Sequence, residues 1–402
     1  MPPVSCQRAR LPLILGAAAF LVACGGGSPS VATPTPQRSS TPAGQSSSTS
    51  TSTSAAPTPS PTPDPCAVAS QSPPTATLAA NYPTALAFAP DGRLFFTERS
   101  GTVRVWQGGA TRAFASVSTV TTERGGGYSE RGLLGIAISP TFASDRFVYA
   151  FYSDVNYTQQ HVIRWADCGG TGTNGTVIIT LPSGPDCCHK GGRLAFGTDG
   201  MLYVTLGEEH TPTASQDTSD VRGKVLRYRP DGSVPADNPF GAGNPVWAYG
   251  FRNPFGLAIS RTGQMAITDN GPSGDAGSPS TGYDIVFNNV LRGGAYPWAN
   301  CYGYSHPKPP NSNCGSGRTA PDWSSETSTV VPTGATFVDS SGPAGYAGHL
   351  VFCTFGSGGF VLTPGSPHAS VSAGPAACRL DIIQGPDHAV YYSDTQSIHR
   401  LG

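Results

Sequence analysis

The stretch His189-Lys190-Gly191-Gly192-Arg193-Leu194-Ala195-Phe196-Gly197-Thr198-Asp199-Gly200-Met201-Leu202-Tyr203-Val204 contains a histidine, two glycines and two apolar runs joined by Thr-Asp-Gly. An Asp-Gly pair between alternating apolar runs predicts a β-hairpin. Paired glycines let the backbone approach a ligand closely, because they carry no Cβ. The sequence therefore places a histidine at the entrance of a rigid β element, where an acid–base group can act on a bound molecule.

The same hairpin pattern recurs along the chain. It is found in six copies, at residues 86–98, 136–152, 194–206, 257–267, 348–362 and 382–401. Such repeats predict an all-β chain folded as a six-bladed β-propeller with long inserted loops, notably at 207–220 and 269–332. A β-sandwich has similar turns but usually fewer residues. In a propeller, loops from all blades meet at one end of a central channel, so residues distant in sequence can form one cleft.

The N-terminal residues are predicted to be a targeting segment. Arg8 and Arg10 precede an apolar run, Leu11 to Ala23, that is too short to span a bilayer comfortably. Residues 1–23 therefore predict a signal peptide, and the end of this segment, followed by Cys24, resembles the lipobox of bacterial lipoproteins. The resemblance implies a lipid anchor on Cys24, with an ordinary signal peptide as the alternative. We expect an exported, membrane-anchored lipoprotein facing the periplasm or the exterior of a bacterial cell.

Residues 24–75 are rich in Ser, Thr and Pro and contain few charged or large apolar side chains. Such a segment buries too little surface to offset its ordering entropy, so a disordered tether is predicted. Residues 76–402 form the predicted propeller. Only 12% of the residues are charged and the net charge is −1, which argues against a nucleic-acid partner and against a membrane contact other than the lipid anchor.

The chain has ten cysteines, and eight remain after Cys6 of the signal peptide and Cys24 are set aside. An even number of cysteines in an exported protein predicts disulfides. A zinc site is the alternative, but no Cys-x-x-Cys pairs have zinc-finger spacing. The expected pairs are Cys301 with Cys314, Cys353 with Cys378, and Cys168 with Cys187 or Cys188.

Five segments resemble, in order, the soluble glucose/sorbosone dehydrogenase family. They are residues 130–135, which read Glu-Arg-Gly-Leu-Leu-Gly, and residues 189–204, 221–240, 247–256 and 269–298. The resemblance covers nearly all of residues 80–402. It implies a six-bladed propeller that oxidises an aldose sugar or a related alcohol with pyrroloquinoline quinone (PQQ) and Ca²⁺. PQQ-dependent aldose sugar dehydrogenases and hedgehog-interacting-protein-like proteins share this fold, so a quinoprotein oxidoreductase is expected.

The resemblance also implies roles for individual residues. His189 matches the catalytic general base, which takes the proton of the sugar hydroxyl as hydride moves to the quinone. Cofactor binding falls to Arg252, Asn253 and Arg379. The main-chain oxygens of Gly271 and Pro272 match the calcium ligands, and Asp284 and Tyr296 are candidates for a further calcium or loop-bracing role. The electron acceptor is expected to be a small molecule or a respiratory carrier.

The chain departs from the family pattern at three points. Phe255 stands where glucose-oxidising members have a polar residue. Only one arginine, Arg379, lies near the C-terminal position where several relatives have two. No lysine occurs between Phe352 and Gly359. These departures, with the tether and anchor, support the alternative to a dehydrogenase, which is a non-catalytic surface-displayed propeller that binds a glycan or a protein. A lactonase-like propeller needs several carboxylates around calcium, and these loops are poor in them.

Overall fold

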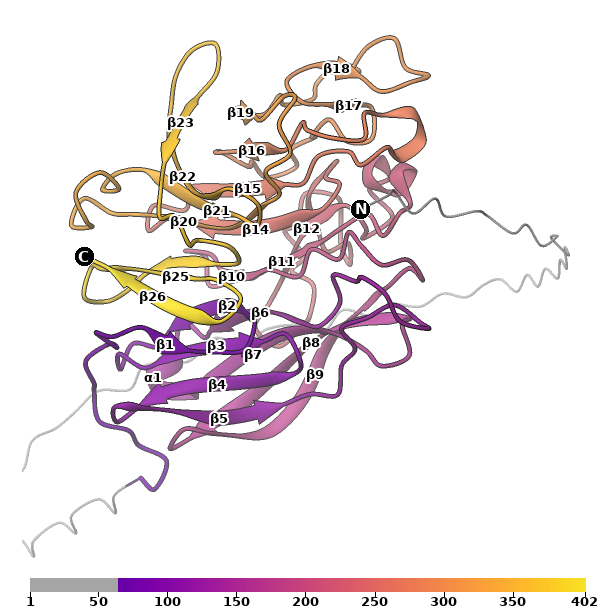
Figure 1. Cartoon of the computed structure of the whole chain (residues 1–402). Helices are drawn as coiled ribbons and strands as arrows, with labels where there is room; N and C mark the ends of the chain where they lie inside the picture. Colours follow the sequence, from indigo (N-terminus) through magenta and orange to yellow (C-terminus); the bar gives the residue numbers. More distant parts are fainter. Residues whose placement is uncertain (1–63) are drawn as a thin grey trace, which may run out of the picture. The chain divides into compact units, whose positions relative to one another are not determined.

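The structure is a computed structural model that describes residues 64–402. The predicted signal peptide, Cys24 and the tether up to residue 63 lie outside the described residues. None of the helices within residues 64–402 is both long and apolar enough to cross a membrane. The described part of the chain forms six four-stranded antiparallel sheets that follow one another along the sequence (Figure 1). The predicted six-bladed propeller is thereby confirmed.

The first three sheets, or blades, each use four consecutive strands. Blade 1 contains β2 (Pro83–Phe88), β3 (Leu94–Glu98), β4 (Thr102–Gln107) and β5 (Ala110–Ser116). Blade 2 contains β6 (Leu133–Ile138), β7 (Phe147–Ser153), β8 (Gln159–Cys168) and β9 (Thr171–Pro182), with α1 (Phe142–Asp145) between β6 and β7. Blade 3 contains β10 (Leu194–Phe196), β11 (Leu202–Leu206), β12 (Lys224–Tyr228) and β13 (Val246–Tyr249), with the 3₁₀ turn η1 (Pro212–Gln216) after β11.

The last three blades include the long insertion and both ends of the propeller. Blade 4 contains β14 (Pro254–Ile259), β15 (Met265–Asp269), β16 (Ile285–Phe287) and β19 (Trp323–Ser324). Its inserted segments hold η2 (Asp275–Gly277) and the small hairpin β17 (Cys301–Tyr302) and β18 (His306–Pro307). Blade 5 contains β20 (Pro332–Phe337), β21 (Leu350–Thr354), β22 (Gly358–Thr363) and β23 (Ser370–Ala373). Blade 6 contains β24 (Ile382–Gln384), β25 (Val390–Ser393), β26 (Ser397–Leu401) and β1 (Leu78–Ala79).

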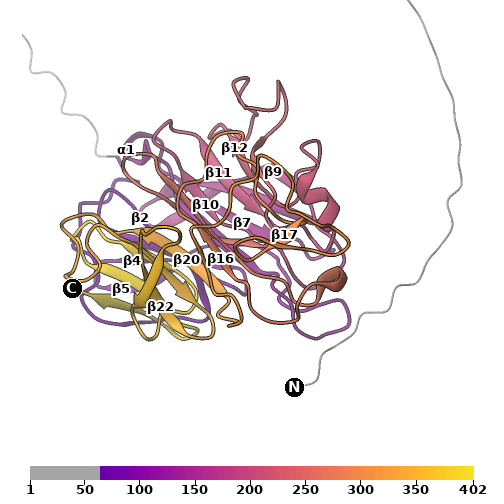
Figure 2. The same cartoon turned by 90° about the horizontal axis from the view of Figure 1, so that it is seen from above.

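Blade 6 closes the ring by combining both ends of the propeller in one sheet. Leu78 of β1 pairs with Ile398 of β26, and Ala79 pairs with Ser397. In the turned view, the yellow C-terminal sheet lies beside the indigo N-terminal sheet (Figure 2). This pairing ties the N-terminal end of the propeller to its last blade and so closes the ring.

Hydrophobic side chains are buried between neighbouring blades rather than inside one central core. One cluster joins blades 2 and 3 and includes Tyr149, Phe151 and Leu226. Similar clusters lie at the other five contacts between blades. Because each sheet buries both faces against its neighbours, whole strands such as β3 and β11 are buried. The central channel is therefore left for polar side chains and cavities.

The inner strands of the blades approach one another closely at the channel. A Cβ on Gly135 would lie 2.1 Å from the carbonyl oxygen of Gly192, and one on Gly256 would lie 2.1 Å from that of Thr333. Only glycine fits such backbone contacts. Four inner strands also carry a bulge near their first residue, as β6 does between Leu133 and Gly135. These bulges lie at the end of the channel where the functional loops meet, called here the site end.

Five of the six predicted hairpins coincide with the first two strands of a blade. The fifth copy, residues 348–362, instead forms β21 and β22, the second and third strands of blade 5. The true inner strand, β20, contains Pro332 and Gly334 and has few large apolar side chains. Its sequence lacks the alternation that identifies a half-buried strand. The structure forms this strand because its neighbours in the ring provide the pairing.

Two predicted disulfides are found, Cys301–Cys314 and Cys353–Cys378. The third prediction was wrong, because Cys168 pairs with Cys66 while Cys187 pairs with the adjacent Cys188. Cys168 ends β8 at one tip of blade 2, and Cys187 follows the other end of the 12-residue strand β9. A strand of that length spans about 40 Å, so these cysteines cannot meet.

Residues 64–75 contact the propeller, although the sequence assigned them to the tether. Cys66 is bonded to blade 2 through Cys168. The Gln71 amide donates a hydrogen bond to the Asp91 carbonyl at 2.7 Å, and Pro74 accepts one from the Tyr391 hydroxyl at 3.0 Å. The chain therefore joins the folded body before residue 76.

Candidate active site

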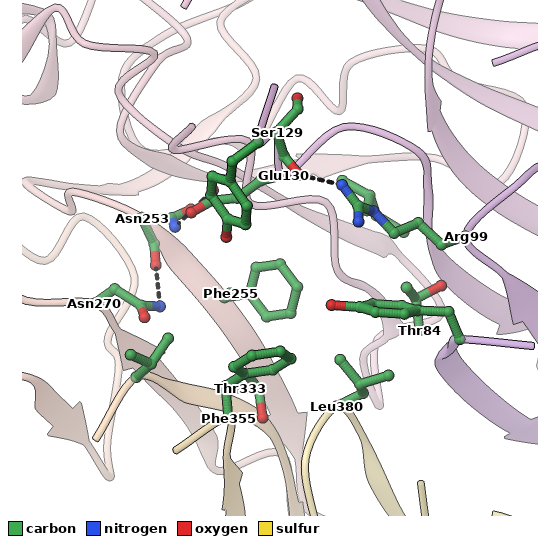
Figure 3. A pocket seen from close by; sticks show the side chains of 14 residues that line it. Thr84, Arg99, Ser129, Glu130, Asn253, Phe255, Asn270, Thr333, Phe355 and Leu380 are labelled. Atoms are coloured by element: carbon green, nitrogen blue, oxygen red, sulfur yellow. Dashed lines mark hydrogen bonds between the residues drawn. The ribbon is translucent and has the colours of Figure 1, made fainter. Parts of the chain in front are cut away.

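A cavity opens at the site end of the channel, with about 690 Å³ of empty space when its solvent-filled mouth is included. Its lining comes from distant segments and combines aromatic rings with a few polar groups (Figure 3). The residues are Tyr82, Thr84, Arg99, Tyr128, Ser129, Glu130, Leu134, Asn253, Phe255, Asn270, Val331, Thr333, Phe355 and Leu380. In Figure 3, Arg99 enters from one side and Asn253 and Asn270 from the other, with Phe255 between them. Such a mostly apolar cavity with few polar groups is typical of a ligand site.

Arg193 forms the floor beneath this cavity. Its guanidinium donates to the carbonyls of Phe255 and Leu380, both at 2.7 Å, and to that of Thr84. It also lies 3.6 Å from the Asp381 carboxylate. A second cavity, lined by the inner strands of all six blades, occupies the opposite end of the channel. Arg193 therefore separates the two cavities and links several blades.

His189 lies just behind the cavity wall and is 3% exposed. Its backbone has a positive φ of 60°, a conformation that residues with a Cβ rarely adopt. The carboxylate of Glu130 fixes this backbone by accepting the His189 amide at 2.7 Å. Glu209 and His210, in the loop opposite, also have positive φ. Unfavourable backbone conformations of this kind concentrate at functional sites.

The side chain of His189 is held by Glu208. A hydrogen bond joins His189 Nδ1 to Glu208 Oε1, and Glu208 is fully buried. Burial lowers the pKa of His189 well below its usual range, helped by the positive charges of Arg252, His210 and Lys190. Burial also raises the pKa of Glu208 to about 8. The imidazole is thus neutral near pH 7, and its Nε2 can accept a proton once Nδ1–H is bonded to the carboxylate.

Further contacts limit the movement of the His189 ring. The ring stacks on that of His210, with centroids 4.0 Å apart. The Cys187–Cys188 disulfide precedes His189 directly, and the Cys187 carbonyl accepts the Glu130 amide at 2.9 Å. These contacts give the proposed base a single orientation, as general-base catalysis requires.

The loop of residues 189–193 also contains a buried ion pair. Lys190 is paired with Glu209, and both side chains are fully buried. Glu209 additionally accepts hydrogen bonds from Gln160 at 3.1 Å and from the Gly184 amide at 3.0 Å. The charges thus have several partners, which a buried pair needs in order to remain ionised.

Asn253 connects His189 to the cavity. Its Nδ2 donates to Glu130 Oε2 at 3.0 Å, and its Oδ1 accepts the Gly191 amide at 3.1 Å. Glu130 and Asn253 both line the cavity, whereas His189 does not. The predicted residues His189 and Asn253 are therefore brought together through Glu130.

Arg252 lies beside this group but its charge is already paired. Its guanidinium is bonded to Asp275 at 2.6 and 2.7 Å and donates to the Asn270 carbonyl at 3.2 Å. The buried carboxylate of Asp269 accepts the amides of Arg252 at 2.9 Å and Asn253 at 2.6 Å. Burial raises the pKa of Asp269 to about 7. Asp269 therefore sets the direction of the whole Arg252–Asn253 segment.

The predicted calcium ligands lie in the adjoining loop. Gly271 and Pro272 directly follow the cavity residue Asn270 and are both buried. Within residues 64–402, none of the hydrogen bonds uses the main-chain oxygen of Gly271 or Pro272. Asp284 accepts the amides of Gly271, Val330 and Val331 at 2.7 to 3.0 Å. Of the two roles expected for Asp284, these contacts match the bracing of loops rather than the binding of calcium.

Tyr296 and Arg379 are placed away from this group. Tyr296 is fully buried between Phe251 and Phe287, and its hydroxyl accepts the Leu291 amide at 3.0 Å. The structure therefore does not bring it to the cavity. Arg379 donates to the Phe355 carbonyl at 3.2 Å and lines a neighbouring hollow. It adjoins the cavity through Phe355, through Thr333, whose hydroxyl donates to the Arg379 carbonyl at 3.0 Å, and through the next residue, Leu380.

The family model described as Glucose / Sorbosone dehydrogenase matches residues 80–397, which is almost the whole propeller. The chain belongs to the glucose/sorbosone dehydrogenase family. The predicted resemblance is thus confirmed. The first five hairpins, the His189 loop and the Arg252–Asn253 segment lie within the matched region, which ends at residue 397, inside the sixth hairpin.

Individual relatives agree with this assignment. The chain is 34% identical to aldose sugar dehydrogenase YliI of Escherichia coli, over 48% of this chain and 55% of that protein. It is 30% identical to quinoprotein glucose dehydrogenase B of Acinetobacter calcoaceticus, over 56% of this chain and 51% of that one. The chain thus spans about half the length of these curated relatives. A solved structure of a putative glucose dehydrogenase from Thermus thermophilus superimposes with a TM-score of 0.68 and 28% identity, over 81% of this chain and 100% of that one.

Glu208 was missed by the sequence analysis, although a signal for it existed. The hairpin register pairs Leu194 with Val204. Extending this register towards the site end places residues 208 and 209 opposite residues 190 and 189. The hairpin register therefore predicts that the loop after β11 faces His189. Asp269 and Asp275 gave no comparable signal, because their contacts join different turns of blade 4.

Proposed function

We propose that this member of the glucose/sorbosone dehydrogenase family is a PQQ- and Ca²⁺-dependent enzyme that oxidises an aldose sugar or a related alcohol. The observation that carries this proposal is the buried His189–Glu208 pair, held by Glu130 and Asn253 at the wall of the cavity. A histidine with only a structural role does not need both a buried carboxylate on its ring and further side chains that fix its backbone. A neutral imidazole with an oriented Nδ1–H is what a general base requires.

His189 is the proposed general base. Its Nε2 takes the proton of the substrate hydroxyl, and the negative charge of Glu208 stabilises the imidazolium that results. Glu130 and Asn253 hold the backbone that carries the imidazole. Because His189 is almost completely buried, substrate must reach it from the cavity side, where water is displaced by the bound molecules.

The residues present fit both absent groups. Tyr82, Phe255 and Phe355 offer flat apolar surface for a planar ring, and Asn253 lines the cavity as a polar partner. Arg252 and Arg379 lie just outside it, in contact with the lining residues Asn270 and Phe355. The unused oxygens of Gly271 and Pro272 are the hard, neutral ligands that Ca²⁺ accepts. When bound, the quinone would supply the two-electron acceptor and Ca²⁺ would act as a Lewis acid.

The N-terminal sequence supports a location outside the cytoplasm as part of this proposal. A leader ending before Cys24 would export the protein and anchor it to a membrane by lipid. Electrons from the sugar would then leave through a small acceptor or a respiratory carrier. Four disulfides within residues 64–402 are in keeping with an oxidising compartment.

Reconstitution tests the proposal. Purified protein is titrated with PQQ in the presence of Ca²⁺, and binding is followed by calorimetry and by the thermal unfolding midpoint. The loaded protein is then mixed with a panel of aldoses and an artificial electron-accepting dye. We expect saturable PQQ binding, a raised unfolding midpoint, and dye reduction with at least one sugar.

A protein that binds no PQQ would favour the alternative function. That alternative is a surface-displayed module that recognises a glycan or a protein without redox chemistry. The Arg252–Asp275 pair is the observation in its favour, because it occupies the guanidinium that would otherwise meet the quinone. Glycan binding without PQQ binding would establish this second function.

A further inference from the structure

Arg99 lines the cavity and was not among the predicted site residues. It follows the last residue of β3, and its guanidinium reaches the loop that leads into blade 2. Its Nε donates to the Arg131 carbonyl at 2.9 Å, and its Nη2 donates to the Thr121 carbonyl at 3.0 Å and to the Ser129 carbonyl. Figure 3 shows the contact with Ser129 at the edge of the cavity. These neutral oxygens fix the guanidinium but do not neutralise its charge.

The charge of Arg99 has no carboxylate partner. In the described chain, no carboxylate oxygen lies within 4.0 Å of its guanidinium, and its Nη1 makes no hydrogen bond. The other two central arginines are different, because Arg252 is paired with Asp275 and Arg193 lies beside Asp381. A partly buried cation without a counter-ion is costly unless an anion joins it. Among the described residues, Arg99 thus presents to the cavity a positive charge that no ion pair neutralises, whereas the one carboxylate of the lining, Glu130, accepts the His189 amide and Asn253 Nδ2 on the opposite wall.

The surroundings of Arg99 indicate the shape of that anion. Its guanidinium lies over the ring of Tyr82, 5.2 Å from the centroid. Phe255 lies further inside with Arg193 beneath it, 4.8 Å from the ring centroid. At the mouth, Tyr128 and Phe355 are 70% and 45% exposed, although large apolar side chains are usually buried. Aromatic faces at several heights beside one cation match a planar aromatic ring that carries a carboxylate.

We propose that Arg99 is a cofactor-binding residue, whose Nη1 contacts a carboxylate of the planar ligand in this cavity. The assignment rests on the proposed function, which makes that ligand PQQ, a flat molecule with several carboxylates. Arg99 then supplies a positive charge that the 352–359 segment lacks, since Phe355 occupies the cavity wall there. The cofactor is held from the blade 1 side by charge and from the blade 5 side by apolar contact.

Two substitutions separate the charge of Arg99 from its bracing of the loop. Arg99→Lys keeps the charge and loses the Nε bond to Arg131, whereas Arg99→Gln loses the charge. Arg112→Gln, at an exposed position on β5 of the same blade, is the matched control. The dissociation constant for PQQ with Ca²⁺ is measured by calorimetry on full-length protein, and unfolding midpoints without PQQ check the fold.

We expect Arg99→Gln to weaken PQQ binding at least about 30-fold, Arg99→Lys to stay within about fivefold of the wild type, and Arg112→Gln to have no effect. Equal weakening by Lys and Gln would mean that Arg99 only braces the loop, and unchanged binding in Arg99→Gln would remove it from the site. If Arg99→Gln is unfolded in the absence of PQQ, Arg99 has a structural role in bracing the loop, and the assignment as a cofactor-binding residue is overturned. If wild-type protein binds no PQQ, the proposed function itself fails, whereas binding that ignores the Arg99 charge overturns only this inference.

Discussion

The two sides of the cavity are built on opposite principles. One side, the polar wall, consists of Glu130, Asn253 and, just behind them, His189 and Glu208. The other side, the aromatic wall, consists of Tyr82, Val331, Phe355 and Leu380. Every residue of the polar wall has named hydrogen-bond partners from other segments. The aromatic wall offers mainly apolar surface to the cavity, and Val331 and Phe355 are exposed at its mouth.

This difference assigns a separate task to each wall. Proton transfer depends on atoms held within a few tenths of an ångström, and such groups must be fixed before substrate arrives. Apolar packing against a planar ligand tolerates small displacements, because dispersion and the burial of apolar surface depend only weakly on direction. The polar wall is therefore expected to govern the rate constant of the reaction, and the aromatic wall to govern ligand affinity.

The largest effect is expected from replacing His189, the proposed base of the polar wall. His189→Gln keeps a polar side chain of similar reach, but an amide cannot accept a proton near neutral pH. We expect kcat to fall by about 10³ to 10⁴-fold while PQQ affinity changes little. Dye-coupled turnover and calorimetry measure the two quantities. His306→Gln, at an exposed histidine of the β17–β18 hairpin, is the control, and turnover within tenfold of the wild type in His189→Gln would refute the assigned role.

The next effect concerns the floor that joins the walls. Arg193→Met would leave the Asp381 carboxylate buried without a counter-charge and would free the carbonyls of Thr84, Phe255 and Leu380. Breaking a buried pair from one side costs about 3 to 5 kcal/mol of unfolding free energy. Denaturant unfolding measures the loss.

The double variant Arg193→Met/Asp381→Asn provides the control for this floor. It should recover part of the loss, because the isolated charge is then gone while the freed carbonyls remain. A loss below about 1 kcal/mol in Arg193→Met alone would show that the link across the channel is not needed for stability.

A smaller effect is expected from the partner of the base. In Glu208→Gln, the side-chain amide can donate to His189 Nδ1, which places the imidazole proton on Nε2 and removes its ability to accept another. We expect kcat to fall about 100-fold, with PQQ affinity unchanged. Glu208→Asp should retain more activity because the acceptor charge survives. Equal turnover in Glu208→Gln and wild type would mean that the hydrogen bond does not select the tautomer.

The fold was largely predictable because its signals are local. Asp91-Gly92 and Asp199-Gly200 mark turns between alternating strands, and each signal fits within about a dozen residues. Strand β20 was not predicted, because its own sequence carries no strand signal and its pairing comes from the neighbouring strands. The Cys66–Cys168 disulfide was not predicted either, because it depends on where the end of the tether contacts blade 2.

The sequence brought out those residues of the candidate site that match the family pattern. His189, Arg252 and Asn253 were found in this way, and the structure brings them together. Contacts made by side chains from unrelated turns were not predictable, as the Asp275 partner of Arg252 illustrates. Tyr296 matched the family pattern but does not reach the cavity, because its side chain packs in the hydrophobic core between blades 3 and 4.

The smallest effect is the pH dependence that the polar wall imposes. Burial raises the pKa of Glu208 to about 8 and lowers that of His189 well below its usual range. While the Glu208 carboxyl keeps its proton, it donates to Nδ1, the imidazole proton sits on Nε2, and the base is blocked. Loss of that proton frees Nε2, so kcat should rise with pH, with its midpoint near pH 8 and a plateau about one pH unit higher.

At pH 7 the rate should therefore be about tenfold below its plateau, since one pH unit separates it from the pKa of Glu208. Rapid mixing of loaded protein with sugar from pH 6 to 10 measures the profile. Glu208→Gln has no group that titrates at this position, so its low residual rate should be flat over the same range. A wild-type profile with its midpoint near 6.5 would instead indicate an ordinary exposed imidazole, and the contrast between a fixed polar wall and an adaptable aromatic wall would lose its chemical basis.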